Sequence, residues 1–495
     1  MGLKLTGRAE EQAILQTFFD SDRPEFLAIY GRRRIGKTYL IKRFFEKKNC
    51  FFFGVTGIQH GEITDQINRF LIEIANVFYQ GAELKKQTNW FDALNMLDKA
   101  IKQFVSKDKK VVLFFDEFPW MVTHRSKLLT EVEYYWNQYW SNDPRIKLII
   151  CGSSASWIVK KIINNKGGLH NRITYKMQLF PFNLKESKSF LLAQGIKLNN
   201  KQVAQLYMVT GGIPYYLSLT KKGLSAVQLI EYLAFSKNSI LFKEFDNLFS
   251  SLFEDAEPYV ELLRIIAKHR YGIDQEKLIK ISKHASRGGR ASEKLTELEE
   301  AGFIISFVPH FHKKRGIYYR VIDEYTLFYL KWIEPVRKNL QKMSLETGYW
   351  EKENDSAAWS TWAGYAFEAI CYKHLSQIRN KLQIGPGAIA STWRYVPKTK
   401  SQENGAQIDL LFDRNDDSIT LCEIKYSEKP FIIDKQYAKN LLNKKEIFIS
   451  KTKTKKQIFI ALIASSGIRE NLYVDDLVDG VVTLDDLFPD YSPPL

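Results

Sequence analysis

Short apolar runs in the amino-terminal half of the chain alternate with longer segments in which apolar residues recur every three or four positions. Short runs of this kind are typical of buried strands, and the longer pattern is typical of amphipathic helices. Strands that alternate with helices predict an α/β fold around a parallel sheet. The pattern predicts strands at residues 26–30, 51–53, 111–115 and 146–151, a continuous helical stretch from Ile63 to about Phe104, and a strand, a turn and a helix over residues 179–193.

The loop after the first predicted strand reads GRRRIGKT over residues 31–38 and fits the template G-x-x-x-x-G-K-[ST] at every fixed position. In such a loop the glycines let backbone N–H groups surround a phosphate, and the helix that follows points its positive end at the same anion. Lys37 then reaches the β- and γ-phosphates, and Thr38 is a ligand of Mg²⁺. The sequence therefore predicts a nucleotide site formed by Gly31, Arg32, Arg33, Arg34, Ile35, Gly36, Lys37 and Thr38.

Two carboxylates follow the third predicted strand, about 80 residues after the loop. Asp116 would hold Mg²⁺ through water, and Glu117 would polarise the water that attacks the γ-phosphate. The fourth strand leads into Ser153 and Ser154, which either sense the γ-phosphate or cap the next helix; the pattern does not separate these two roles. Arg172 is a candidate arginine finger, with an ordinary surface arginine as the alternative.

These motifs, with Gly7-Arg8 and Glu11 before them and GGIPYYL at residues 211–217 after them, resemble in their order the prokaryotic "archaeal ATPase" family. That family is related to the signal-transduction (STAND) ATPases of the AAA+ class. The resemblance covers about residues 1–235. It implies that the nucleotide is ATP, that Arg8 belongs to the nucleotide site, and that Gly212 and Pro214 lie near the adenine and link nucleotide state to the next domain.

The pattern changes over residues 257–334, where three helical segments precede two alternating runs at residues 303–307 and 316–321 that are typical of a β-hairpin. Three helices and a hairpin predict a winged helix-turn-helix. Basic residues lie at the start of the third helix and at the hairpin tip, where they would meet a major groove and a phosphate backbone: Arg287, Arg290, Lys294, Lys313, Lys314 and Arg315. In STAND proteins such a module often packs on the ATPase instead, so both roles stay open.

The last part of the chain begins with an aromatic-rich helical segment that contains Glu368, followed by two strands around a turn at residues 413–417. One strand carries Asp409; the other carries Glu423 and Lys425, which are two residues apart and therefore on one face of the sheet. Two acids and a lysine suit metal-assisted phosphodiester hydrolysis, in which the acids hold Mg²⁺ and the lysine positions or deprotonates the nucleophile. Glu368 would add an outer contact to the metal.

The order of these four residues resembles that of the PD-(D/E)xK restriction-endonuclease-like nucleases over about residues 355–480. The proline that this motif places before its first acid is missing, since Gln407 and Ile408 precede Asp409. The resemblance implies a nuclease fold but does not settle whether the site is active. A solvated strand pair with salt bridges is the alternative.

The chain carries a net charge of +16 and a sequence pI of about 9.3, which favours an anionic partner, most often nucleic acid, over a merely basic protein. With the predicted winged helix, we expect this nucleic acid to be DNA, although the sequence does not separate DNA from RNA. Its four cysteines lie far apart, which predicts buried thiols and no zinc site. The start of the chain lacks an apolar signal core, and no apolar run is long enough to span a bilayer. We therefore expect a cytoplasmic protein without a membrane partner.

Together these patterns predict an α/β multidomain protein: a P-loop parallel-sheet ATPase core over residues 1–180, a helical lid over 181–256, a winged helix over 257–345 and a mixed α/β endonuclease-like domain over 355–495. Its expected cofactors are ATP and Mg²⁺. The expected function is ATP hydrolysis coupled to cleavage of nucleic acid, and the resemblance suggests defence against foreign DNA as the setting. The alternatives are an ATP-dependent DNA-binding switch or scaffold that does not cut, and a homo-oligomeric DNA-translocating ATPase that uses Arg172 across a subunit contact.

Overall fold

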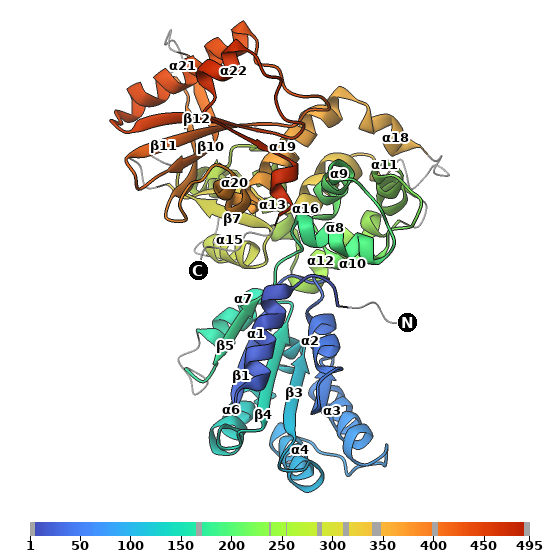
Figure 1. Ribbon diagram of the computed structural model, residues 1–495. Helices are drawn as coiled ribbons and strands as arrows, with labels where there is room; N and C mark the ends of the chain where they lie inside the picture. Colours follow the sequence, from blue (N-terminus) through green and yellow to red (C-terminus); the bar gives the residue numbers. More distant parts are fainter. Residues whose placement is uncertain are drawn as a thin grey trace. The chain divides into compact units, whose positions relative to one another are not determined.

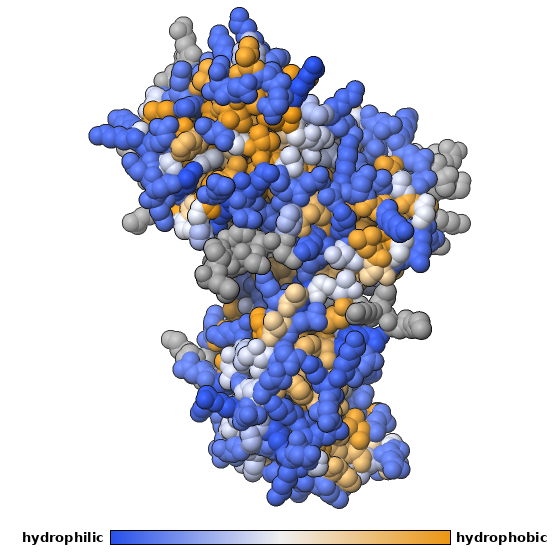
Figure 2. Space-filling view, in the orientation of Figure 1, coloured by the Kyte–Doolittle hydropathy of each residue, from blue (hydrophilic) through white to orange (hydrophobic). Residues whose placement is uncertain are grey.

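The computed structural model describes residues 5–164, 171–236, 239–253, 255–284, 290–309, 316–338, 348–397 and 404–489. The chain forms two compact units: one runs to Pro181 and includes Glu300–Gly302, and the other consists of Phe182–Glu299 and Phe303–Leu495. Figure 2 shows a surface that is mostly hydrophilic with apolar patches between. Within the described ranges no helix has the length and apolar character that crossing a membrane requires.

The first unit is built around a five-stranded parallel sheet with the strand order β2-β3-β4-β1-β5. Its strands are β1 (Glu25–Tyr30), β2 (Cys50–Thr56), β3 (Lys110–Asp116), β4 (Ile146–Gly152) and β5 (Tyr175–Gln178). The strand predicted to begin at Leu179 was misplaced, because β5 ends at Gln178. Edge strand β5 is only partly buried and mixes Lys176 and Gln178 with apolar residues, so it lacks the continuous apolar run of its neighbours.

Helices cover both faces of this sheet (Figure 1). They are α1 (Ala9–Asp20), α2 (Lys37–Phe45), α3 (Ile63–Phe78), α4 (Trp90–Phe104), α5 (Phe118–Met121), α6 (Leu128–Gln138) and α7 (Ala155–Ile158), the last continued by a π-turn at Val159–Ile163. Apolar residues of α3, α4 and α6 form one core with alternate residues of the central strands. On the other face the ring of Phe45 in α2 meets those of Phe19 in α1 and Phe52 in β2.

The continuous helix predicted from Ile63 to Phe104 is two helices separated by residues 79–89. Gly81 ends the first with a φ of 81° and donates its N–H to the carbonyl of Ala75, a geometry that favours glycine. Asn89 begins the second by accepting the N–H of Asp92 at 2.9 Å. Apolar residues recur with the same spacing on both sides of the turn, so the hydrophobic pattern did not indicate this break.

The second unit begins with a set of helices: α8 (Leu184–Ala193), α9 (Asn200–Thr210), α10 (Pro214–Ser218), α11 (Ala226–Ile230) with a π-turn at Glu231–Phe235, and α12 (Ile240–Leu252). Helix α10 starts at Pro214, which is tolerated in a first turn because its N–H would have no helical partner. Helices α13 (Glu257–Ala267), α14 (Gln275–Ile281) and α15 (Arg290–Glu300) then precede the hairpin of β7 (Ile304–Phe307) and β8 (Tyr318–Val321).

A two-residue strand, β6 (Ile273–Asp274), pairs antiparallel with β8 and was missed, because two residues carry no periodicity. The third helix of this segment presents Arg290 to solvent, and the ammonium of Lys294 lies 4.7 Å from the ring of Tyr259. Arg287, Lys313, Lys314 and Arg315 lie outside the described residues. Their contact with DNA stays a prediction.

The rest of the second unit contains a mixed five-stranded sheet with the order β13-β12-β11-β10-β9. Its strands are β9 (Ile389–Tyr395), β10 (Ala406–Asp413), β11 (Ser418–Lys425), β12 (Gln457–Ala464) and β13 (Gly480–Thr483); β9, β10 and β11 are antiparallel, and β11, β12 and β13 are parallel. The accompanying helices are α16 (Glu324–Phe328) with a π-turn at Tyr329–Ile333, α18 (Tyr349–Asn354), α19 (Ala357–Lys373), α20 (Leu375–Lys381), α21 (Lys435–Thr452) and α22 (Leu472–Leu477).

The polar stretch at residues 351–356, near which the sequence predicts a domain boundary, is largely helical, and its side chains are exposed or half-buried. Most of it belongs to α18, whose Trp350 is fully buried and meets the rings of Phe235, Trp332 and Trp359. The three predicted domains after residue 180 lie in the second unit, apart from Pro181 and Glu300–Gly302, and their boundaries stay predictions. All four cysteines are free thiols; Cys50, at the start of β2, is half-buried, whereas the other three are buried as predicted.

His374 joins two helices of the second unit. Its Nε2 accepts the N–H of Leu184 at 3.2 Å, and its Nδ1 lies 2.8 Å from the carbonyl of Ile370. Burial lowers the pKa of His374 to about 4, from an ordinary value of 6.5. Only the neutral ring can accept the Leu184 N–H, so protonation breaks this contact.

We therefore predict that acidification from pH 6.5 to 4 destabilises the protein through His374. The folded ring binds its proton less tightly than the unfolded one, so stability is lost as pH falls below the unfolded pKa, by up to about 3 kcal/mol at pH 4. Thermal unfolding of His374→Gln should show a smaller loss of Tm between these pH values than the unchanged protein. His124→Gln, at an exposed position, is the control. An unchanged acid profile in His374→Gln would contradict the prediction.

Candidate functional site

The strand order of the first unit decides which loops meet at the carboxyl edge of its sheet. β4 lies between β1 and β3, so the residues that follow these three strands are neighbours although they are far apart in sequence. The loop at residues 31–38 follows β1, Glu117 follows β3, and Ser153 follows β4. In parallel sheets this edge is where ligands bind.

The loop after β1 depends on two glycines. Gly31 has a φ of 141°, and a Cβ there would lie 2.3 Å from the carbonyl oxygen of Leu179. Gly36 has a φ of 89° and begins helix α2. Both conformations exclude most other residues, so the glycines are required for the turn that directs backbone N–H groups toward a phosphate.

Lys37 is buried and is held at the centre of this edge. Its ammonium donates to the carbonyls of Gly31 at 2.8 Å and Arg32 at 2.9 Å, and to the hydroxyl of Ser153 at 3.0 Å. These three bonds use all three N–H groups of the ammonium. The cation is therefore fixed by the loop and by β4 together.

Ser153, which accepts from Lys37, also donates two hydrogen bonds to Glu117. The hydroxyl of Ser153 donates to Glu117 Oε1, and the backbone N–H of Ser153 donates to Glu117 Oε2 at 2.9 Å. Glu117 itself has a φ of 46°, a left-handed conformation that is uncommon for a non-glycine residue and is held here by this two-point contact. Lys37, Ser153 and Glu117 thus form one hydrogen-bonded chain across β1, β4 and β3.

Thr38 and Asp116 come together at the same edge. The hydroxyl of Thr38 lies 3.0 Å and 2.9 Å from the two carboxylate oxygens of the buried Asp116, and Thr56 adds a contact at 3.3 Å. A hydroxyl and a carboxylate at one point are the oxygen donors that Mg²⁺ takes next to a nucleotide. These residues fit a magnesium ion, which would neutralise phosphate charge there.

The predicted arginines around the loop have separate positions. Arg8 is buried, pairs with Glu11 at 3.2 Å and donates to the carbonyl of Ile35 at 3.1 Å, so it supports the loop from helix α1. Arg32 is buried, and Ile35 is buried as well. The guanidinium of Arg33 lies 5.8 Å from the ring of Trp120, and Arg34 has a φ of 71°. Arg8 acts on the loop backbone, a contact that the sequence did not predict.

Two predicted residues are not brought to this edge within the first unit. Arg172 is exposed and precedes β5, and the N–H of the nearby Thr174 bonds to Phe26 near the amino end of β1. That position is at the opposite edge of the sheet from the loop. Pro214 belongs to the second unit. The roles of both residues stay predictions.

A second group of chemically active side chains lies on the mixed sheet of the second unit. Lys425 Nζ is 2.9 Å from Glu423 Oε1, so these two residues share a face as the period-two pattern requires. Asp409 on β10 accepts the N–H of Ile424 at 3.2 Å and the amide of Gln407 at 3.0 Å. Burial, and then the charge of Glu423, raise the pKa of Asp409. The two acids are therefore neighbours.

Helix α21 supplies two partners that sequence analysis missed. Lys444 donates to Glu423 Oε2 at 2.6 Å, and the hydroxyl of Tyr437 donates to Glu423 Oε1 at 2.7 Å. Burial raises the pKa of Glu423, but the ion pairs with Lys444 and Lys425 lower it overall. Tyr437 and Lys444 are seven residues apart, so they lie on one face of α21, beside the buried Ala438 and Leu441. Two polar residues next to an apolar stripe were the sequence pattern that could have indicated these partners.

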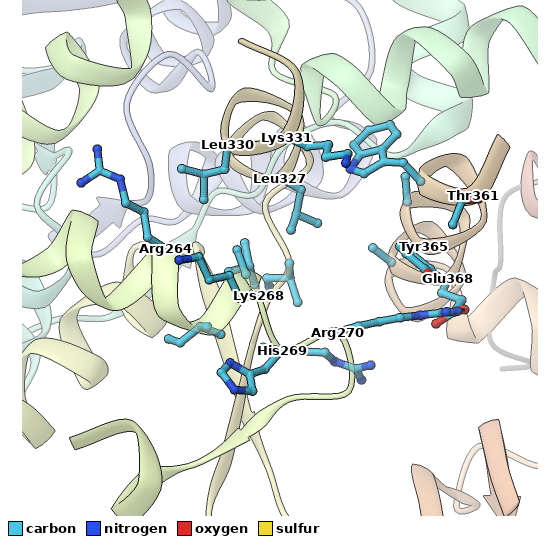
Figure 3. Close-up of a pocket in the computed structure, with 18 of the residues that line it drawn as sticks. Arg264, Lys268, His269, Arg270, Leu327, Leu330, Lys331, Thr361, Tyr365 and Glu368 are labelled. Carbon is cyan, nitrogen blue, oxygen red and sulfur yellow. Dashed lines mark hydrogen bonds and ion pairs between the residues drawn. The ribbon is translucent and has the colours of Figure 1, made fainter. Parts of the chain in front are cut away.

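Glu368 on α19 pairs with Arg270, which follows α13 (Figure 3). Burial, and then the charge of Asp409, raise the pKa of Glu368 to about 7, although Arg270 opposes this shift. Across the described parts of the chain, no three His, Cys, Asp or Glu side chains are grouped to hold a metal ion. The Mg²⁺ site predicted at Asp409 and Glu423 stays a prediction, since Tyr437, Lys425 and Lys444 occupy the oxygens of Glu423. The outer metal contact predicted for Glu368 stays a prediction.

Comparisons with known proteins agree with the geometry of the first site. Residues 5–220 match the family model of an ATPase domain predominantly from Archaea, and residues 329–446 match a family of archaeal and bacterial proteins of unknown function. The amino-terminal part of the chain is therefore similar to a P-loop ATPase domain of this archaeal kind.

Two relatives come from Methanocaldococcus jannaschii. An uncharacterized protein is 27% identical over 426 residues, 85% of this chain and 87% of that protein. An uncharacterized ATP-binding protein is 44% identical over 41 residues, 8% of this chain and 70% of that protein.

Two solved structures are similar over part of the chain. The Walker-type ATPase of Pyrococcus abyssi has a TM-score of 0.46 at 17% identity, covering 66% of this chain and 96% of that one. The ORC2 protein of Aeropyrum pernix, solved in ADPNP–ADP complexes, has a TM-score of 0.42 at 15% identity, covering 68% of this chain and 95% of that one.

The chain of Lys37, Ser153 and Glu117 leads to a prediction about Ser153→Ala. This change removes the hydroxyl but keeps the backbone N–H that holds Glu117, so ATP should still bind while hydrolysis falls about tenfold or more. Phosphate release and equilibrium binding of a fluorescent ATP analogue measure the two effects separately. Ser154→Ala, at the next position, is the control. Equal loss of binding and turnover would show that Ser153 supports the loop as a whole.

Proposed function

We propose that this protein hydrolyses ATP at the P-loop site and that the state of this site controls a Mg²⁺-dependent phosphodiesterase site in the second unit that acts on nucleic acid. The observation that carries the first half is the hydrogen-bonded chain from Lys37 through Ser153 to Glu117. It joins the cation that would contact the γ-phosphate to the carboxylate that would orient the attacking water. Any change at the γ-phosphate would reach Glu117 through one serine.

Mg²⁺ would be held by Thr38 and Asp116, which already meet at the carboxyl edge of the sheet. Bound there, the ion would stabilise negative charge on the β- and γ-phosphates. Lys37 and the loop N–H groups would bind the same phosphates, and Glu117 would polarise water. Ser153 would orient Glu117, which makes it a positioning residue.

Asp409, Glu423 and Lys425 support the second half of the proposal. The two acids are adjacent, and the lysine lies 2.9 Å from Glu423, so all three converge at one point of the sheet. Two carboxylates suit Mg²⁺, and a cation next to them suits the negative charge that develops at a phosphodiester during hydrolysis. Lys444 adds a second cation to this point.

One contact within the second unit supports a link between the predicted adenine element and the acids. A Cβ on Gly211 would lie 3.0 Å from Glu324 Oε2, and the same oxygen pairs with Lys373 at 2.5 Å. Lys373 ends helix α19, which carries Glu368. Glu324 is fully buried, so a shift of the turn at Gly211–Pro214 would disturb a buried ion pair at the end of that helix.

A non-cleaving switch or scaffold is the second candidate. It is favoured by the three donors on Glu423, because Tyr437, Lys425 and Lys444 together satisfy this carboxylate without a metal ion. Under this alternative the trio is a structural ion-pair network that holds α21 on the sheet. Cleavage assays separate the two candidates.

For the ATPase half, we predict that Glu117→Gln retains ATP affinity within about threefold but loses about 100-fold or more in turnover, because an amide cannot polarise water as a carboxylate does. Lys37→Ala should instead weaken ATP binding, because it removes a cation from the phosphates. Glu83→Gln, in an exposed loop, is the control. Normal turnover in Glu117→Gln would rule out this role.

For the nuclease half, we predict metal-dependent cutting of nucleic acid that Asp409→Ala and Lys425→Ala abolish without changing ATP binding. The assay uses plasmid, linear duplex, single-stranded DNA and RNA with Mg²⁺ or Mn²⁺, with and without ATP. Asp476→Ala on the exposed face of α22 is the matched control. If ATPase activity is intact and none of these substrates is cut, the switch or scaffold becomes the better proposal.

A further inference from the structure

A cleft of about 520 Å³ lies beside Asp409 in the second unit. One wall comes from the segment that contains β6, β7 and β8, including Arg270, Tyr271 and Arg320; the other comes from β9, β10 and the end of α21, including Arg394 and Lys451. Asp409 lines the same cleft. With Glu368 and Tyr372 of α19, three segments of the chain form the space into which the proposed phosphodiesterase site opens.

The cleft suits a polyanion. Its lining includes four cationic side chains, those of Arg270, Arg320, Arg394 and Lys451, against two carboxylates, those of Glu368 and Asp409. Glu368 is already paired with Arg270, as Figure 3 shows from the adjoining pocket. The lining therefore has more cationic than acidic side chains, and a Mg²⁺ at Asp409 would increase the positive charge further.

Aromatic rings lie next to these cations. The guanidinium carbon of Arg320 is 3.6 Å from the ring centre of Tyr372, that of Arg394 is 4.6 Å from Tyr271, and the ammonium of Lys451 is 4.4 Å from Tyr395. Tyr271 is 37% exposed. Alternating cations and rings are how proteins hold phosphates and stack bases along one strand.

Arg320 offers the cleft a hydrogen-bond donor that has no acceptor in the part of the chain that is described. Its Nε is shielded from solvent and has no hydrogen-bond partner among the described residues, although the guanidinium stacks on Tyr372. A buried N–H without a partner costs stability unless an acceptor completes it. A phosphate oxygen in the cleft would supply that acceptor.

We propose that this cleft binds an unpaired strand of DNA or RNA and leads it to Asp409. In a duplex the bases stack on one another, so their faces are not available to Tyr271 and the other rings; only an unpaired strand offers both phosphates and free base faces. The inference deepens the proposed nuclease function, on which it rests for the reaction. Binding itself requires only the cleft.

The test measures binding of the full chain in EDTA, which prevents cleavage. Fluorescence anisotropy with labelled single-stranded DNA, single-stranded RNA and duplex DNA of equal length compares the three partners at several salt concentrations. We expect a single strand to bind about tenfold or more tightly than the duplex. Tyr271→Ala should weaken single-strand binding about tenfold and leave duplex binding nearly unchanged, because it removes a stacking surface.

Arg394→Ala should weaken single-strand binding and also reduce its salt dependence, because it removes a phosphate contact. Arg469→Ala and Tyr473→Ala, at exposed positions outside the cleft, are the matched controls. Equal affinity for duplex and single strand, or full affinity in both cleft variants, would overturn the cleft proposal. Strand binding that depends on Tyr271 and Arg394 supports it even if no cleavage is found, a result that would count against the nuclease alone.

Discussion

The hydroxyl of Ser153 bonds to a cation and to an anion at the same time, and the strand order of the first unit allows both contacts. It accepts from the ammonium of Lys37 and donates to the carboxylate of Glu117. Both contacts require β4 to lie between β1 and β3, so the strand order is a chemical requirement of the site.

In the second unit a buried carboxylate is stabilised by direct contact with cations. Glu423 is buried, and a buried carboxylate is costly unless donors satisfy it. Two lysines and a tyrosine from different elements provide those donors. Asp409, in contrast, has a neutral amide and a backbone N–H as its donors, and burial and then the charge of Glu423 raise its pKa. The two neighbouring acids therefore differ: one is saturated, and the other is available to a ligand.

The sequence was informative where function depends on residues that are close along the chain. The loop at residues 31–38, the acids at the end of β3 and Ser153 after β4 each follow an apolar run, so a template and a strand pattern were enough to anticipate their meeting. Glu423 and Lys425 were placed on one face by period-two geometry alone. Hydrogen-bond and ion-pair partners that come from distant elements could not be predicted from such local patterns. Lys444, Tyr437 and Arg270 reach their acids through packing across 14 to 98 positions of sequence, and no local pattern encodes that choice. The break at Gly81 was hidden for the opposite reason, because the local pattern continued through it.

The doubled cations on Glu423 have a consequence for how this position can change over evolutionary time. Loss of either lysine leaves the carboxylate with one cation and a tyrosine, and both lysine side chains are partly exposed and can turn to water if the acid is lost. Replacing a buried ion pair with apolar groups is often neutral or favourable for folding. Selection for folding alone would therefore let this trio drift apart, and a lineage that had no use for its chemistry could discard it at little cost to the sheet beneath.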